Sequence, residues 1–390
     1  NLKTVIKYMG RNMTTKPSEK TLVVVQMTGG NDFMNTLVPY TNGHYYDARK
    51  KVVIRENQVL PINDELGINE NAAPFKRLYD EGKMAIIQGI GYPDSNRSHF
   101  RGMDIWHTAE PDRVGSEGWL GQAVRELDPK AENVLTGVNI GAGLPRAMAV
   151  TGVPVTSVGD LEGYGVMNRI EQDRLKNKAL ETFKGIYGQA IGTGPVADYI
   201  GQTGLDVLSG ADLLAEVADN YESTVEYAEN PIAKSLRDVA RIHLSGLGTR
   251  IFYTQHGGYD THANELAGHP KLMTDVSGAI SDFLDDLEEH GASDNVTVFA
   301  FTEFGRRMRD NGSGTDHGTG GGAFIYGKNV QGGLYGQYPS LDPADWEHGE
   351  DLKHHIDFRG IYATLLEQVL DVEARPIVKG EYEQISPFRA

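Results

Sequence analysis

Short runs of apolar, mostly β-branched residues recur along the chain, separated by segments in which apolar residues have helical spacing. Such runs are typical of strands that are buried on both faces of a parallel sheet. They occupy residues 22–27, 84–89, 135–140, 146–150, 250–254, 296–301 and 323–326. The pattern predicts a three-layer α/β/α fold with a mostly parallel central sheet. One common edge of this sheet is expected to hold the ends of strands near 22–27, 84–88, 250–255, 296–302 and 323–326.

The segments between these runs are expected to form helices that cover the sheet. Apolar residues share one helical face over residues 264–290, which predicts a long amphipathic helix there. Other helices are expected at 74–82, 118–127, 171–187, 196–220, 232–244 and 357–369. We therefore predict an N-terminal arm (1–20) and a single α/β domain (21–390) with a helical insertion at about 165–247.

Composition narrows the classes of function. The 390 residues include 37 basic and 54 acidic side chains, for a net charge of −17. This balance argues against non-specific binding to nucleic acid or to an anionic membrane surface. The chain has no cysteine, which excludes disulfides, thiolate catalysis and Cys-ligated zinc. No apolar run is long enough to span a membrane, and no signal peptide is visible. The first residue is Asn1, which fits a processed exported protein as well as a trimmed chain.

Acids and histidines lie in polar, Gly-rich loops that follow the apolar runs. Asp32 follows the first run, Asp260 and His262 follow a later one, and Glu303 and His317 flank the loop between the last two. In open α/β sheets, ligands bind outside the carboxyl ends of the strands. These side chains are therefore candidates for a common site, although Asp32 could equally cap the next helix.

A second candidate is the segment RSHFR, which follows the run at 84–89. Ser98 is expected at the start of a helix, where free backbone N–H groups attract an anion. Arg97, His99 and Arg101 flank this hydroxyl, and the combination suits attack on an anionic ester. The alternative is that Ser98 only caps the helix.

Five stretches stand in a fixed order: GGND (29–32), RSHF (97–100), GGYDTH (257–262), TEFGRR (302–307) and TDHG (315–318). Together they resemble the bacterial family called domain of unknown function 1501, over residues 21–370. The family is placed among alkaline-phosphatase-like and sulfatase-like proteins. The resemblance implies an alkaline-phosphatase-like α/β domain, a hydrolytic site that usually holds two metal ions, and twin-arginine export to the periplasm or out of a bacterial cell.

Individual residues follow from the resemblance. Asp32 takes the place of the metal-binding Asp after the first strand, and Ser98 that of the nucleophile. Asp260, His262 and His317 take the places of further metal ligands. The superfamily's Asp-His pair is represented here by Glu303-Phe304, so one histidine ligand is missing, and Asp260 and His262 are closer in sequence than usual. A single metal ion, a harder ion or loss of catalysis are all consistent with these departures.

The sequence thus predicts a divalent-metal site formed by Asp32, Asp260, His262, Glu303 and His317, with zinc or manganese favoured and calcium as an alternative. Asp316 would orient a neighbouring ligand or cap the loop. A hydrogen-bonded polar cluster without metal is the competing interpretation.

The predicted reaction is hydrolysis of a small anionic ester, a phosphate rather than a sulfate, with Ser98 as the attacking group. Arg97, Arg101 and Arg306 would bind the ester oxygens. His99 would protonate the leaving group or substitute for the histidine missing at Phe304. The rival hypothesis is an exported binding or assembly protein that keeps the fold without the chemistry. The sequence indicates neither the partner nor the oligomeric state.

Overall fold

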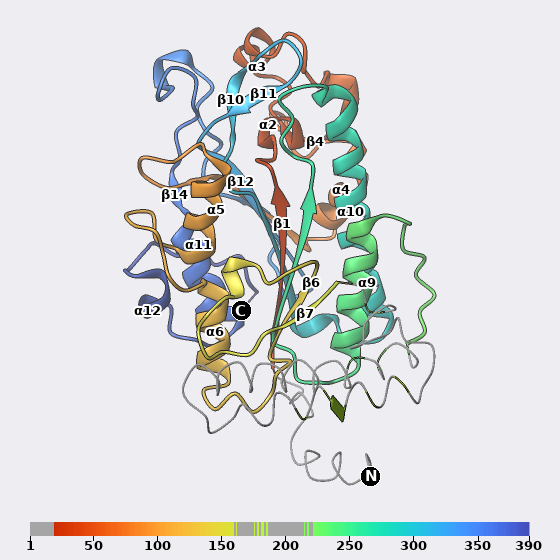
Figure 1. Cartoon of the computed structure of the whole chain (residues 1–390). Coiled ribbons are helices and arrows are strands. Elements are labelled where there is room, and N and C mark those ends of the chain that lie inside the picture. Colours follow the sequence, from red (N-terminus) through yellow and green to blue (C-terminus); the bar gives the residue numbers. More distant parts are fainter. Residues whose placement is uncertain are drawn as a thin grey trace.

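The computed structural model describes residues 19–159 and 221–389, together with positions 161, 175, 178, 181, 182, 185, 214 and 217. Among these residues a nine-stranded sheet forms the centre of the molecule (Figure 1). Its strands are β1 (Thr21–Thr28), β5 (Met84–Gly91), β6 (Gly137–Ile140), β7 (Thr156–Val158), β8 (Ile251–Gly257), β9 (Val296–Phe301), β12 (Gly321–Tyr326), β13 (Gly333–Tyr335) and β14 (Ile356–Asp357). Their order is β13-β5-β12-β9-β1-β8-β6-β7, and β14 also pairs with β5.

The sheet is mostly parallel, as predicted. β1 pairs in parallel with β8 and β9, and β6 pairs in parallel with β7 and β8. Only β12 is antiparallel to its neighbours β5 and β9 among the pairs of described strands in this sheet. The prediction that the strand at 323–326 ends at the common edge is therefore wrong: β12 begins there. Residues 302–320, which connect β9 to β12, contain no helix, and a parallel return normally needs a helical crossover.

Helices cover both faces of the sheet (Figure 1). One face packs against α4 (Ala73–Asp80), α9 (Pro231–Leu244) and α10 (Glu265–Glu289). The other packs against α5 (His99–Thr108), α6 (Trp119–Leu127), α11 (Phe358–Thr364), a π-helical turn (Leu365–Val369) and α12 (Arg375–Val378). Alternate residues of β1 point to opposite faces, so Val23 and Val25 lie in the first apolar layer and Leu22 and Val24 in the second. The predicted three-layer α/β/α architecture is confirmed.

Smaller elements gather beyond the carboxyl ends of β1 and β8, at the top of Figure 1. They include α2 (Phe33–Thr36), α3 (Gly43–Ala48), the hairpin of β10 (Arg306–Asp310) and β11 (Thr315–His317), and the small sheet β2 (Leu37–Val38), β3 (Val59–Pro61) and β4 (Gly67–Asn69).

Most of the predicted helices that fall on described residues are present, including the long one over 264–290. The expected strand at 146–150 is wrong, because Arg146–Met148 form a 3-10 turn. Its apolar side chains pack with those of α6 instead of joining the sheet. The predicted helices at 171–187 and 196–220 lie outside the described residues apart from single positions, so the extent of the helical insertion and the N-terminal arm remain predictions. None of the helices in the described part of the chain is long and apolar enough to cross a membrane.

Candidate metal centre

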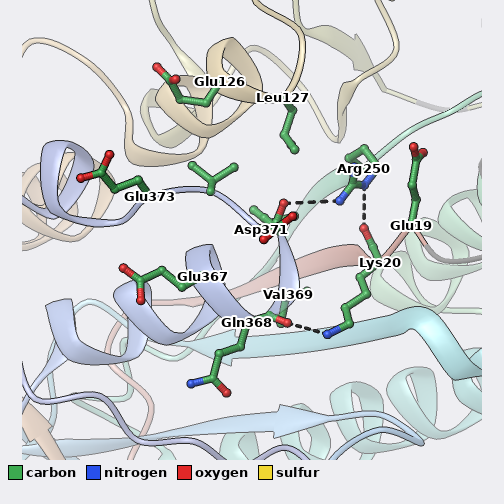
Figure 2. A pocket seen from close by; sticks show the side chains of 12 residues that line it. Glu19, Lys20, Glu126, Leu127, Arg250, Glu367, Gln368, Val369, Asp371 and Glu373 are labelled. Carbon is green, nitrogen blue, oxygen red and sulfur yellow. Dashed lines mark hydrogen bonds between the residues drawn. The ribbon is translucent and has the colours of Figure 1, made fainter.

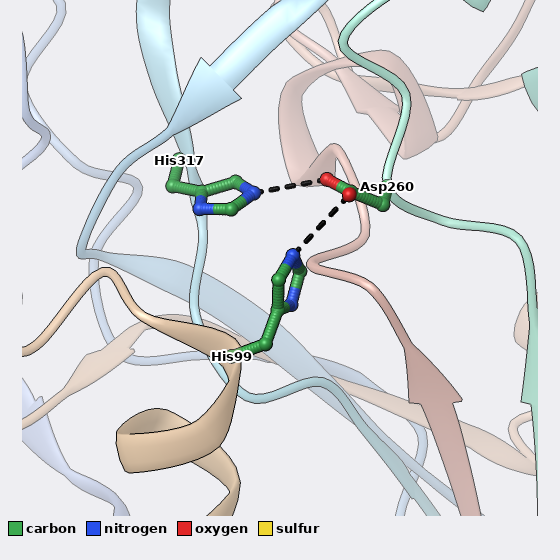
Figure 3. A group of neighbouring side chains, drawn as sticks. All are labelled: His99, Asp260 and His317. Atoms are coloured by element: carbon green, nitrogen blue, oxygen red, sulfur yellow. Dashed lines mark hydrogen bonds and ion pairs between the residues drawn. The ribbon is translucent and has the colours of Figure 1, made fainter.

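Three side chains from distant parts of the sequence meet beyond the carboxyl edge of the sheet (Figure 3). His99 begins α5, Asp260 lies in the loop after β8, and His317 ends β11. One ligand atom from each of the three lies within 4.8 Å of the others. His317 Nε2 is 2.9 Å from Asp260 Oδ1, and His99 Nε2 is 3.3 Å from Asp260 Oδ2. The two imidazoles thus approach the two oxygens of one carboxylate.

His262 adds a third imidazole to this group. Its Nε2 lies 3.2 Å from Asp260 Oδ1 and 2.9 Å from His317 Nε2. The side chains of His262 and Asp260 are 43% and 47% exposed, so the group opens to solvent on this side. Three ring nitrogens therefore lie within 3.3 Å of the oxygens of one carboxylate.

The other nitrogen of each ring is held by an acceptor. His99 Nδ1 lies 2.9 Å from Glu303 Oε1, His262 Nδ1 lies 3.0 Å from Asp316 Oδ1, and His317 Nδ1 lies 2.8 Å from the carbonyl of Arg97. A carboxylate or carbonyl can only accept, so each Nδ1 carries a hydrogen and each Nε2 of a neutral ring presents a lone pair. Histidines that bind a metal are held in this way by a carboxylate or a carbonyl.

Two contacts indicate that a cation fits between these groups. The lone pairs of His262 Nε2 and His317 Nε2 face each other at 2.9 Å, which is repulsive when both rings are neutral. His99 Nε2 is buried and makes no hydrogen bond, despite its 3.3 Å distance from Asp260. Buried polar atoms are rarely left without a partner. A cation bound to the Nε2 atoms would remove the repulsion between His262 and His317 and would give His99 Nε2 a partner. The donor set of imidazole nitrogen and carboxylate oxygen is one that zinc and manganese accept.

The charge state of the carboxylate favours a cation as well. Partial burial acts to raise the pKa of Asp260, but the neighbouring His317 and Arg306 outweigh it and lower this pKa to about 2. The hydrogen bond to Glu303 raises the pKa of His99, whereas burial lowers the pKa of His317. Asp260 is therefore ionised at any pH at which the histidines are neutral.

Arg306 holds the loops that carry this group. Its guanidinium is buried and donates to the carbonyls of Gly29, Gly30, Tyr259 and Thr315, and to Asp260 Oδ1 at 3.0 Å. Gly29 has φ of +124°, and a Cβ on it would lie 2.3 Å from the backbone nitrogen of Asp260. The GGND loop therefore packs directly against the Asp260 loop, and a side chain at Gly29 would separate them.

Phe304 lies beside the two imidazoles of His99 and His317. Its ring centroid is 4.5 Å from that of His317 and 5.0 Å from that of His99, and the side chain is buried. The phenyl ring thus forms an apolar wall behind both imidazoles. It supplies no ligand for a second metal ion.

The structure brings together only part of the ligand set predicted from the sequence. Asp260 and His317 lie in one group with His99, and His262 contacts both of them. Glu303 stands behind this group as the partner of His99. Glu303 is fully buried and accepts the backbone N–H of Gly29 at 2.9 Å. It therefore orients His99 and takes no direct part in the group of His99, Asp260 and His317.

Asp32 lies in a separate buried cluster. It caps the short helix α2 by accepting the N–H of Met34 at 3.2 Å, and it forms a fully buried ion pair with Arg49. Burial acts to raise the pKa of Asp32, but the charge of Arg49 outweighs it and lowers the pKa. The carboxylate is thus neutralised by a guanidinium, which fits the helix-cap interpretation better than the metal-ligand one.

The residues predicted to act on the ester differ in whether their side chains are free to contact a substrate. Ser98 is exposed at the N-cap position of α5, and its hydroxyl makes no capping bond. Arg101 is bound to Asp104 and to the carbonyls of Glu110 and Pro111. Arg306, as described above, is buried and saturated. These two arginines have no guanidinium edge free for a substrate, whereas Ser98 is accessible.

The sequence interpretation missed Arg49 and Glu265, which surround Asp32. Glu265, at the start of α10, accepts Asn35 Nδ2 at 2.8 Å and the hydroxyls of Thr261 and Thr315 at 3.2 and 2.7 Å. Burial, with the nearby charge of Asp32, raises the pKa of Glu265 to about 8. No local pattern marks Arg49 or Glu265, because their partners are distant in the sequence.

The raised pKa of Glu265 predicts a pH-dependent stability. The folded chain holds the Glu265 proton more tightly than the unfolded chain, in which the carboxyl has its usual value of about 4.5. This contribution is therefore complete below about pH 4.5 and is lost as the pH rises toward 8, on the order of 5 kcal/mol at about 1.4 kcal/mol for each pH unit. Urea unfolding of the Glu265→Gln protein between pH 5 and 8 should show a flatter profile than the unaltered protein. Parallel profiles would contradict a protonated Glu265.

Hollows among the described residues lie at both edges of the sheet. One of about 640 Å³ lies at the opposite, amino edge of the sheet and is lined by Lys20, Arg250 and several acids (Figure 2). Lys20 Nζ and Arg250 Nε donate to backbone carbonyls there, at 2.7 Å each. A second hollow of about 510 Å³ lies at the carboxyl edge, lined by the ends of β6 and β8. None of His99, Asp260 and His317 lines either hollow, and we place the candidate site at the carboxyl edge because this group lies there.

Comparison with known families agrees with the sequence motifs. The family model described as "Protein of unknown function (DUF1501)" matches residues 79–373. The chain belongs to this family. The family predicted from the five motifs is thus confirmed, and its description assigns no activity. No curated protein matches the chain.

Solved structures with a similar arrangement include sulfatases and members of the alkaline phosphatase superfamily. The PsFucS1 sulfatase from Pseudoalteromonas sp. has 12% identity and a TM-score of 0.42, over 98% of this chain and 72% of that chain. A protein of the alkaline phosphatase superfamily from Vibrio parahaemolyticus has 10% identity and a TM-score of 0.34, over 84% and 65%. The alkaline phosphatase from the Antarctic bacterium TAB5 has 12% identity and a TM-score of 0.35, over 82% and 95%. Sequence identities and TM-scores this low do not assign an activity to the DUF1501 chain.

Proposed function

We propose that this DUF1501 chain is an exported, metal-dependent hydrolase of anionic esters. One observation carries the proposal: the Nε2 atoms of three histidines converge on the Asp260 carboxylate, while each Nδ1 is held by a separate acceptor. The four side chains come from three separate segments, because Asp260 and His262 share one loop. Without a cation this group leaves two lone pairs opposed and one ring nitrogen without a partner.

The proposed ligands are His99, Asp260, His262 and His317. This set replaces Asp32 and Glu303 of the sequence prediction with His99, which thereby takes the place of the histidine missing at Phe304. Zinc or manganese suits three imidazoles and a carboxylate better than calcium, which prefers oxygen ligands. Such a cation would polarise an ester oxygen and offset its negative charge.

The attacking group in this proposal is Ser98. It directly precedes the ligand His99, it is exposed, and its hydroxyl is not used to cap α5. A hydroxyl next to a bound cation can have its pKa lowered, which makes it a better nucleophile. Because His99 is assigned as a ligand, it is no longer the proposed acid for the leaving group. The chain has a net charge of −17, so the local cationic groups must attract the substrate.

Replacing Ser98 with alanine tests whether Ser98 is the attacking group or only an exposed serine at the start of a helix. We expect turnover to fall at least about a hundredfold, as for loss of an essential catalytic group. The melting temperature should change little, because an exposed side chain without a capping bond contributes less than about 0.5 kcal/mol. Steady-state kinetics and thermal melting of Ser98→Ala and the neighbouring control Ser95→Ala decide the question. Turnover retained in Ser98→Ala would remove Ser98 from this role.

The function itself is tested by metal content followed by an ester screen. Protein purified without chelator should contain about one divalent ion per chain, as expected for a single four-ligand site. It should hydrolyse some phosphate mono- or diester, or some sulfate ester. Absence of stoichiometric metal, with melting unchanged by added zinc, manganese or calcium, would favour a polar cluster without metal. Bound metal with no turnover on any ester would favour the rival function, an exported binding or assembly protein that keeps a structural metal.

A further inference from the structure

The arginines around the candidate metal centre differ in how fully they are bonded. Arg49, Arg101 and Arg306 each donate several hydrogen bonds to carbonyls and carboxylates. The side chains of Arg97 and Arg307, by contrast, donate none to any described residue, although they are only 37% and 32% exposed. Both side chains are thus partly exposed, and their guanidinium groups keep N–H groups that donate to no described residue.

A buried carboxylate lies between these two arginines. Asp351 is 0% exposed, and its oxygens lie 3.4 Å from Arg97 Nη1 and 3.6 Å from Arg307 Nε. Neither oxygen of Asp351 makes a hydrogen bond, and Arg97 Nη1 and Arg307 Nε are themselves buried without one. The charge of Asp351 therefore attracts the two guanidinium groups, although it accepts no hydrogen bond from either.

The backbone ties both arginines to the candidate metal centre. The carbonyl of Arg97 accepts the Nδ1 hydrogen of His317 at 2.8 Å. Arg307 follows Arg306 in β10, and Arg306 pairs with His317 across the β10–β11 hairpin. The two guanidinium groups therefore extend from the segments that position His99 and His317.

We propose that Arg97 and Arg307 form an anion subsite, which binds a second negatively charged group of the substrate beside the reacting ester. The inference rests on the proposed function, and it narrows the substrate class to anionic esters that bear a further sulfate, phosphate or carboxylate group. A guanidinium has planar pairs of N–H groups that match the oxygens of such anions.

Binding of inorganic phosphate and sulfate, measured by isothermal titration calorimetry in the presence of chelator, tests the subsite without a metal. We expect the full chain to bind one anion, and we expect Arg97→Gln and Arg307→Gln each to weaken binding at least about tenfold, as for loss of a charge-assisted hydrogen bond. The control is Arg309→Gln on the same strand, because Arg309 is 56% exposed, lies 3.5 Å from Glu350 and stacks over Trp346. This control should bind the anions as the unaltered protein does.

Two results would overturn the subsite: no anion binding by the unaltered chain, or equal affinity in all three variants. Failure of the proposed function looks different. If no ester is hydrolysed but anion binding depends on Arg97 and Arg307, the subsite stands and the hydrolase assignment falls. If an ester is hydrolysed with metal, Arg307→Gln should raise KM for substrates with a second anionic group and leave KM for singly charged esters unchanged. An equal KM for both classes would count against the subsite alone.

Discussion

Replacing His317 with alanine is expected to abolish metal-dependent turnover and to lower metal affinity by at least about a hundredfold, the upper end of the loss seen when even an outer partner of a ligand is removed. His317 Nε2 lies 2.9 Å from both Asp260 Oδ1 and His262 Nε2, so its ring is at the centre of the four proposed ligands. Its loss leaves two imidazoles and one carboxylate, a set with a vacant position.

The measurement is metal content by elemental analysis, together with titration of zinc and manganese into chelator-treated protein. His44→Ala is the matched control, since His44 is an exposed residue of the short helix α3 and lies outside the group. Unchanged metal content in the His317→Ala protein would rule out the proposed centre. Metal lost equally in both variants would indicate that the ion is bound elsewhere.

Replacing Arg49 with methionine is expected to reduce the free energy of unfolding by about 3–5 kcal/mol, because it leaves the buried Asp32 carboxylate without its cation. Arg49 Nη1 and Nη2 both bind Asp32, and Arg49 Nε donates to the carbonyl of Met308 at 2.7 Å. The change therefore also releases β10 from α3. Metal affinity should fall much less than stability, because neither Arg49 nor Asp32 belongs to the proposed ligand set.

Urea denaturation in chelator measures this effect without a contribution from bound metal. The control is Lys50→Met, which breaks the exposed pair with Asp47 and should cost less than about 1 kcal/mol. The companion variant Asp32→Asn tests the ligand role that the sequence suggested for Asp32. Full loss of metal with little loss of stability in Asp32→Asn would support that role and contradict the structural one.

The buried parts of the sheet could be predicted from sequence because they are local. A run such as LVVVQM has few alternatives to a strand that is covered on both faces, and β1 forms there. The amphipathic spacing over 264–290 likewise fixed the long helix α10. The order of short motifs around the Gly-rich loops indicated which loops would meet, because the carboxyl ends of parallel strands share one edge.

Other features depended on contacts that no local pattern records. The direction of β12 follows from a connection without a crossover helix, and the apolar residues at 146–150 face a helix and not a strand. In both places the apolar residues are as expected, but they do not specify the neighbour against which they pack.

The sequence by itself thus determined the layered α/β/α fold, the family and the acids and histidines at the carboxyl edge, because each of these depends on residue type and local spacing. Only the tertiary structure decided which of these groups meet. Asp32 and Glu303 carry the same kind of side chain as Asp260, yet Asp32 is neutralised by Arg49 and Glu303 orients His99. The role of a charged side chain is set by its partners in space. In this chain those partners come from segments as far apart as Gly29 and Glu303.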